Sequence, residues 1–210
     1  TIALLRKKTF GGWPEKDVPL NEKQVSKIER NGVVIESVDF DSQEKIRLGV
    51  LLSYRSGLKN PKRIELKVLN GENDLQQGPL ENSDVVYVAF APRGLGRTAL
   101  SDDKTHRTQT RRRFMLLGQT LAGMQVWDVR RCVQMLRELG YDCPIILKGD
   151  GEAASLVSLA ALYEKVETVS VKNYPKDDKA QPDYLNISRI VTPAQVLDLV
   201  RQRSKLNHRK

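Results

Sequence analysis

A short run of small and acidic residues stands where a strand should pass directly into a helix. The run is Gly149-Asp150-Gly151-Glu152-Ala153, and it follows an apolar strand expected at 144–148. In an open α/β sheet, ligands bind at the carboxyl ends of the strands. The pattern that places a nucleophilic serine on such a turn is Gly-x-Ser-x-Gly. Here the first glycine fits and Ala153 is an acceptable small residue at the last position. The nucleophile position holds Gly151, which has no side chain to attack a substrate.

Other residues are expected to line a cleft at the same edge of the sheet. The full set of candidates is Asn70, Gly71, Arg93, His106, Asp150, Gly151 and Glu152. Backbone N–H groups near Glu152 and Asn70-Gly71 could hold an acyl oxyanion, and Asp150 or His106 could activate a water molecule. Structural interpretations stand beside these roles. Gly151 serves a tight turn, Glu152 favours a helix N-terminus through the helix dipole, and His106 belongs to a basic loop.

Two further signals indicate no catalytic role. Ser155 lies one helical turn beyond Gly151, so its side chain should point along the helix and away from the cleft. The run 91–98 nearly matches the phosphate-binding loop GxxxxGK[ST]. However, Ala91 replaces the first glycine, Arg97 replaces the lysine, and a loop rather than a helix is expected to follow. Nucleotide binding is therefore not expected.

The elements that must position these residues alternate between apolar strands and helices. Strands are expected at 33–40, 46–54, 63–69, 85–90, 144–148 and from 169, and the first two should form a hairpin. Helices are expected at 114–139, 152–164 and 193–203, the last with Thr192 as its N-cap and Pro193 at its first position. Continuous apolar strands that alternate with helices predict parallel strands covered on both faces.

The predicted architecture is an α/β fold with an open, mainly parallel sheet flanked by helices. It should be a truncated three-layer sandwich that begins with an antiparallel hairpin. Residues 1–30 are expected to form an irregular extension, and residues 31–210 a single domain. The run 72–84 is polar and holds little that could form a long helix.

Composition limits the classes of function. The chain has 210 residues, of which 40% are hydrophobic, so it can bury a core, and no apolar run approaches the roughly 18 residues of a membrane helix. The net charge of +9 comes from two stretches, 104–113 and 201–210, which carry five basic residues each and no acid. We expect both stretches to be solvated rather than to bind nucleic acid. Two cysteines, Cys132 and Cys143, and two histidines argue against a structural zinc site, and we expect no metal and no cofactor.

Several motifs resemble those of a known family. The run Arg93-Gly94-Leu95-Gly96-Arg97-Thr98 resembles the Arg-Gly-x-Gly-x-Ser turn of the acetyl xylan esterase-like group within the α/β-hydrolase superfamily. The stretch 111–131 resembles the helix before that family's nucleophile turn, and 9–14 resembles a segment of long bacterial members. By order of elements the resemblance covers about residues 33–175. It implies an α/β-hydrolase fold, a carbohydrate esterase activity and export from a bacterial cell.

The departures from the family fall on its catalytic residues. Members carry a serine where Gly151 stands, and their catalytic acid and histidine follow later strands, for which this chain has little length. We interpret the chain as a degenerate, truncated hydrolase domain that is non-catalytic on its own. A first residue of Thr1 suits the C-terminal half of a longer protein. The expected partners are then an active hydrolase half of the same parent chain and a polysaccharide.

Two alternatives stay open. The first is a working carbohydrate acetyl esterase that takes its catalytic groups from outside the usual turn. The second is a basic anion-binding module that uses Lys104, Arg107 and Arg111–Arg113.

Overall fold

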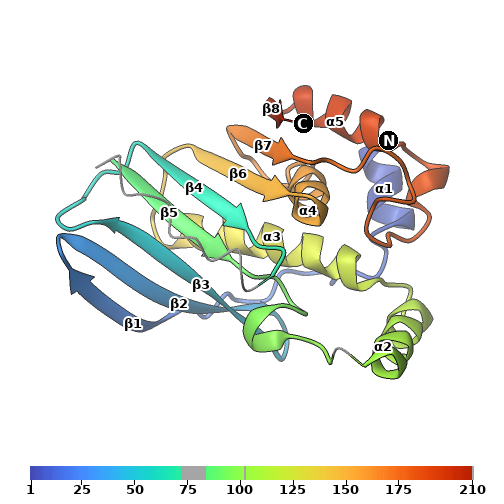
Figure 1. Cartoon of the computed structure of the whole chain (residues 1–210), viewed down its shortest axis with the longest axis horizontal. Coiled ribbons are helices and arrows are strands. Elements are labelled where there is room, and N and C mark those ends of the chain that lie inside the picture. Colours follow the sequence, from blue (N-terminus) through green and yellow to red (C-terminus); the bar gives the residue numbers. More distant parts are fainter. Residues whose placement is uncertain (72–83, 102, 210) are drawn as a thin grey trace.

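The computed structural model describes residues 1–71, 84–101 and 103–209, in which one sheet holds eight strands in the order β1-β2-β3-β5-β4-β6-β7-β8 (Figure 1). The strands are β1 (Lys23–Arg30), β2 (Val33–Gln43), β3 (Ile46–Arg55), β4 (Arg63–Val68), β5 (Val85–Phe90), β6 (Ile145–Asp150), β7 (Thr168–Lys172) and β8 (Lys205–Arg209). The helices are α1 (Ile2–Lys8), α2 (Lys104–Leu116), α3 (Leu121–Glu138), α4 (Glu152–Ala160) and α5 (Pro193–Arg201). Short 3-10 turns, η2 (Gly96–Thr98) and η3 (Ile187–Arg189), lie between them.

The sheet is mixed, as the sequence predicts. Strands β5, β4, β6, β7 and β8 run parallel to one another, whereas β1, β2 and β3 form an antiparallel meander whose last strand, β3, pairs antiparallel with β5. The hairpin predicted at 33–40 and 46–54 is confirmed as β2 and β3. Because β4 and β6 are adjacent and parallel, the chain that follows Val68 and the turn that follows Asp150 lie at the same edge of the sheet.

The prediction that residues 1–30 are irregular is wrong. This segment contains α1 and β1, and its side chains Leu5, Phe10, Trp13 and Leu20 are buried in the main core. Trp13 stacks on Phe10 with ring centroids 4.3 Å apart, and its indole N–H donates to the backbone oxygen of Gly123 on α3 at 2.7 Å. The segment belongs to the core because these aromatic rings find partners on helices that are distant in sequence.

The single helix predicted at 114–139 is also wrong, because it consists of two helices. Gly118 takes a positive φ of 65° that ends the first, and Thr120 caps the second by accepting from the N–H of Gly123. The first helix, α2, starts upstream, where Asp103 accepts from the N–H of His106. The basic run 104–113 is therefore helical rather than a loop. None of the residues of α2 is fully buried, whereas α3 buries most of its length.

The helices that pack on the sheet lie on one side of it. Helix α4 contacts β6 and β7, and α3 packs beside α4 (Figure 1). In this view no described helix lies in front of the sheet. The burial of β4 and β6 alternates residue by residue, as a sheet with one buried face requires. The second helical layer of the predicted sandwich is not seen among the described residues, and the predicted loop at 72–84 falls almost wholly outside them.

The C-terminal elements begin as predicted and then extend the sheet. Thr192 accepts from the N–H of Gln195 while the Gln195 side chain accepts from the N–H of Thr192, which forms a capping box with Pro193 at the first helical turn. The basic stretch after α5 is not only a solvated tail, because Lys205–Arg209 forms strand β8 beside β7.

Candidate functional site

The turn between β6 and α4 has the backbone of a nucleophile turn without its nucleophile. Gly151 adopts φ 55° and ψ −120°, a conformation that L side chains rarely take. Gly149 is constrained for another reason: a Cβ there would collide with the backbone of Ala153, so the first turn of α4 can approach the strand only over a glycine. The Gly-x-Gly spacing is thus explained by a sharp strand-to-helix passage, which is the structural context of the Gly-x-Ser-x-Gly motif.

Asn70 clamps this turn from the neighbouring strand end. Its Oδ1 accepts from the backbone N–H of Ala153 at 2.8 Å, and its Nδ2 donates to the backbone oxygen of Asp150 at 2.5 Å. One N–H at the N-terminus of α4 is therefore already satisfied by a protein group. The Asp150 carboxylate is engaged in turn, since Asn173 Nδ2 donates to it at 2.8 Å and Lys172 Nζ lies 3.8 Å away.

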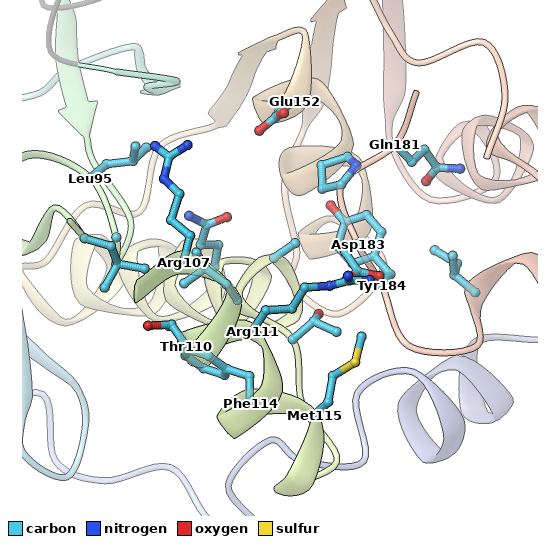
Figure 2. Close-up of a pocket in the computed structure, with 18 of the residues that line it drawn as sticks. Leu95, Arg107, Thr110, Arg111, Phe114, Met115, Glu152, Gln181, Asp183 and Tyr184 are labelled. Atoms are coloured by element: carbon cyan, nitrogen blue, oxygen red, sulfur yellow. The ribbon is translucent and has the colours of Figure 1, made fainter. Parts of the chain in front are cut away.

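A cleft of about 900 Å³ opens beside the turn (Figure 2). One wall is α2 and the other is the segment 178–188, while the start of α3 and the turn residues Asn70 and Glu152 complete it. Figure 2 shows Arg107 and Arg111 of α2 and Glu152 of α4 bordering the same open space. The Nε of Arg111 lies 2.7 Å from Asp183 Oδ2, so an ion pair links the two walls.

The structure brings together only some of the seven candidates. Asn70 and Glu152 line the cleft and flank Gly151. Gly71 instead borders a smaller groove of about 310 Å³, next to η2. The Arg93 side chain is buried against Asp128 on α3, and neither Arg93 nor His106 lines the cleft.

The two histidines lie on elements away from the turn. His106 is exposed on α2, where its Nδ1 is 3.1 Å from Asp103 Oδ2. His208 is on the edge strand β8, with its ring centroid 6.2 Å from that of Tyr174. Among the described residues, no three His, Cys, Asp or Glu side chains gather as a metal ion would need.

Sequence reasoning missed a group of hydroxyls beneath the turn. Ser155, Tyr174 and Tyr184 are buried, and within the described part of the chain their hydroxyls have no partner at hydrogen-bond distance. Burial raises the pKa of both tyrosines well above the usual value. Ser158 and Ser155 oppose the rise only partly at Tyr174, and Ser155 does so at Tyr184. Tyr184 also lines the cleft. No motif in the sequence signals this group, because its members come from three separate segments.

Comparison with known proteins identifies the fold. No protein-family model and no curated protein matches the sequence. Among solved structures, a candidate acetyl xylan esterase from Bacteroides fragilis is similar with a TM-score of 0.67 and 12% identity, over 99% of this chain and 72% of that one. A glucuronoyl esterase from Solibacter usitatus is similar with a TM-score of 0.65 and 11% identity, also over 99% and 72% of the two chains. The chain has an α/β-hydrolase fold.

The α/β-hydrolase match covers only part of several relatives. Acetyl xylan esterase 1 from Thermoanaerobacterium sp. is similar with a TM-score of 0.58 and 12% identity, over 82% of this chain but 58% of its own. An acetyl xylan esterase from Paenibacillus sp. is covered over 54% of its length. The fold expected from the motifs is thus confirmed, whereas the catalytic state has to be argued from the site itself. No helix within the described ranges is long and apolar enough to cross a membrane.

Proposed function

We propose that this chain is a non-catalytic α/β-hydrolase-like domain that supports the binding of an acetylated carbohydrate beside an active hydrolase half. The observation that carries this proposal is Gly151, which occupies the nucleophile position at φ 55° and ψ −120°. Covalent ester hydrolysis needs a side chain at that point with a base within hydrogen-bond reach. Gly151 offers no side chain, and the nearby Ser155 is fully buried on the helix.

The other parts of a hydrolytic site are missing from the same place in the described residues. His106 is exposed on α2, with its Nδ1 3.1 Å from Asp103 Oδ2, and it does not line the cleft. Asn70 accepts from the N–H of Ala153 at the start of α4, so this N–H group is not available to a ligand. The missing nucleophile and the absence of a histidine from the cleft lining, among the described residues, agree with a non-catalytic domain.

The cleft retains what a binding site needs. Its volume of about 900 Å³ suits a ligand larger than one sugar ring, and its walls offer both carboxylate and amide groups. Glu152, Asn70 and Gln125 can exchange hydrogen bonds with sugar hydroxyls. The esterases with which the chain shares its fold are named for acetylated xylan and glucuronoyl esters, and this supports a carbohydrate ligand.

Turnover of p-nitrophenyl acetate tests the catalytic half of the proposal. We expect no rate above buffer for the unmodified chain, and no saturable rate for Gly151→Ser, because a serine there still lacks a base. His106→Ala serves as the comparison. A saturable rate in the unmodified chain that His106→Ala abolishes would mean a working esterase and would overturn the proposal.

Calorimetric titration with acetylated xylo-oligosaccharides tests the binding half. We expect saturable binding that Glu152→Gln weakens several-fold and that the distant exposed control Glu44→Gln leaves unchanged. Absence of binding at millimolar ligand would contradict a carbohydrate cleft while leaving the catalytic result standing.

A second candidate function is an anion-binding module, and the structure adds one observation in its favour. Lys104, Arg107 and Arg111–Arg113 share one exposed helix with no acidic residue in it. Binding to heparin that weakens steeply as salt rises, and that Arg112→Gln reduces, would support this candidate. Heparin binding that does not depend on salt would rule out the anion-binding function.

A further inference from the structure

Strand β1 is an open edge of the sheet that is exposed along its whole length. All eight of its residues are exposed, and they include two large apolar side chains, Val25 at 53% and Ile28 at 61%. β1 pairs with β2 on one side and has no neighbour on the other within the described sheet. An edge of this kind carries unpaired N–H and C=O groups that can bind another strand.

The turn between β1 and β2 determines which groups face outwards. Asn31 and Gly32 both have positive φ, 53° and 72°, which is the two-residue hairpin turn that Asn-Gly favours. Such a turn is closed by a hydrogen-bonded pair, here Arg30 with Val33. Bonded and non-bonded pairs alternate along an antiparallel ladder. Arg30 and Ile28 therefore bond to β2, while the backbone groups of Lys27 and Glu29 point away from the sheet.

We propose that β1 pairs with β1 of a second copy of this chain, antiparallel about a two-fold axis at Ile28. In this register Lys27 lies opposite Glu29 of the partner subunit, and Glu29 lies opposite the partner's Lys27. Both pairs use the outward backbone groups, so each closes two main-chain hydrogen bonds. Both pairs also place opposite charges face to face, which stabilises a cross-strand pair.

The charges of Lys27 and Glu29 favour this register over the alternative with the two-fold axis at Lys27. Outward backbone groups can also meet if the axis passes through Lys27, but then Lys27 faces the partner's Lys27, and like charges directly opposite each other destabilise the pair. The Glu29 carboxylate forms no ion pair with any described residue of its own chain, so it is available to the partner. Lys27 Nζ lies 3.8 Å from Glu36 Oε2 and 5.8 Å from the centre of the Tyr54 ring of its own chain. Its side chain is still 49% exposed, so it can also approach a carboxylate of a second copy.

The opposite face of the pair is apolar. Ile28 pairs with Ile35 of β2, so the two side chains share a face of the sheet. Across the two-fold axis the Ile28 and Ile35 side chains of both copies then form one continuous stripe. Ile28 is 61% exposed in the single chain, and burial of part of that surface in the pair favours association.

A bulge limits the contact to two chains. The β1–β2 register shifts between Gln24 and Ser26. A bulge bends and twists a strand and interrupts its pairing. The flat, regular part of the edge is therefore only Ser26–Arg30. A short contact of this kind across a two-fold axis closes on itself, so the edge builds a dimer rather than a fibre.

Sedimentation equilibrium over about 1–500 µM tests the proposal through charge reversal, because a dimer of this size dissociates on dilution. We expect dimers for the unmodified chain and a dimer affinity about tenfold weaker for Lys27→Glu and for Glu29→Lys. An equal mixture of those two variants should recover dimers, since the carboxylate introduced in one copy then faces the ammonium group introduced in the other. The double variant Lys27→Glu/Glu29→Lys should recover them for the same reason. Lys23→Glu, with the same change of charge outside the pairing, should dimerise normally.

Two results would overturn the proposal. One is a monomer at every concentration. The other is a dimer that neither single variant weakens, which would place the contact elsewhere. Circular dichroism of each variant checks that the strand has not unfolded, so that a lost dimer reports the contact and not the fold.

Discussion

The Arg93 guanidinium binds the Asp128 carboxylate through two parallel hydrogen bonds, Nε to Oδ2 at 2.8 Å and Nη2 to Oδ1 at 2.7 Å. Asp128 is fully buried and the Arg93 side chain is 11% exposed. The backbone N–H of Arg93 donates to the same carboxylate, and Ser42 Oγ donates to it at 2.5 Å. The pair thus fastens the chain after β5 and the end of β2 to α3, which assigns Arg93 a structural role rather than a place in the cleft.

Removal of one member of this pair should be costly. We expect Asp128→Ala to lower the free energy of unfolding by about 3–5 kcal/mol, because it leaves the Arg93 charge buried without its partner. The double variant Arg93→Met/Asp128→Leu should lose less than Asp128→Ala alone. Urea unfolding followed by tryptophan fluorescence measures both. A loss below about 1 kcal/mol for Asp128→Ala would show that water replaces the carboxylate.

A side chain at the turn should fit in space and yet strain the backbone. A Cβ on Gly151 meets only the Asn70 amide, at 3.6 Å, but φ is 55°. We therefore expect Gly151→Ser to cost about 1–2 kcal/mol of unfolding free energy. Gly57, at φ 79° with open space around it, provides the control, and Gly57→Ser should cost about the same. A much larger loss for Gly151→Ser would mean that the turn rejects the side chain itself.

The Glu65 carboxyl should make the stability of the fold depend on pH. Burial by itself would raise the pKa of Glu65, but hydrogen bonds and charges from Lys148 and Arg63 outweigh it and hold that pKa below the usual value. Folding therefore favours the ionised form of Glu65. The stability that this carboxylate adds to the fold is fully present above pH 4.5 and is lost as the pH falls through the lower folded-state pKa.

Glu65→Gln checks this dependence. The variant should cost about 1 kcal/mol of unfolding free energy at pH 7. This cost should shrink as the pH falls below 4.5 and through the lower folded-state pKa, because the carboxyl is then protonated in both states. Glu44→Gln, an exposed position, controls for the general effect of removing a charge. A difference between wild type and Glu65→Gln that grows on acidification would contradict the sign of the shift.

Helix α2 should open more easily than the other long helices. It has 13 residues, none of them fully buried, and an isolated helix of that length is marginal in water. An exposed ion pair, Arg111–Asp183, links it to the other wall of the cleft. Hydrogen exchange should show α2 amides exchanging at least tenfold faster than those of α3, and Asp183→Asn should widen the gap. Equal protection of α2 and α3 would contradict this.

Most of the sheet could be predicted from sequence because its signals are local. Strands such as Val85–Phe90 are short apolar runs between polar segments, and the helix at Pro193 is marked by its own capping residues. The N-terminal segment was missed because its aromatic rings gain partners only in three dimensions. The Asn31-Gly32 turn is a local signal for β1, because Asn-Gly favours a two-residue hairpin turn.

In the candidate site, too, the local features could be predicted from sequence and the contacts between distant residues could not. Gly149 and Gly151 indicated a sharp turn at the sheet edge, and Asn70 and Glu152 do meet beside it. The clamp from Asn70 joins residues about 80 positions apart, and the Arg111–Asp183 link joins residues 72 positions apart. No local pattern encodes such pairs. The placement of His106 depended on whether the basic run was a loop or a helix, which propensity alone does not decide.

The docking of the N-terminal segment has a consequence for folding kinetics. The Trp13 indole N–H donates a hydrogen bond to the backbone oxygen of Gly123, which lies 110 residues further along the chain. The backbone oxygen of Ile2 accepts from the hydroxyl of Tyr163, which lies 161 residues further along. During synthesis this segment cannot form these contacts until α3 and α4 have been made. Contacts of such long sequence separation slow folding, because loop entropy is lost before the contacts form. Fluorescence from Trp13 should therefore report one of the last events in refolding, after the hairpin of β2 and β3 has formed.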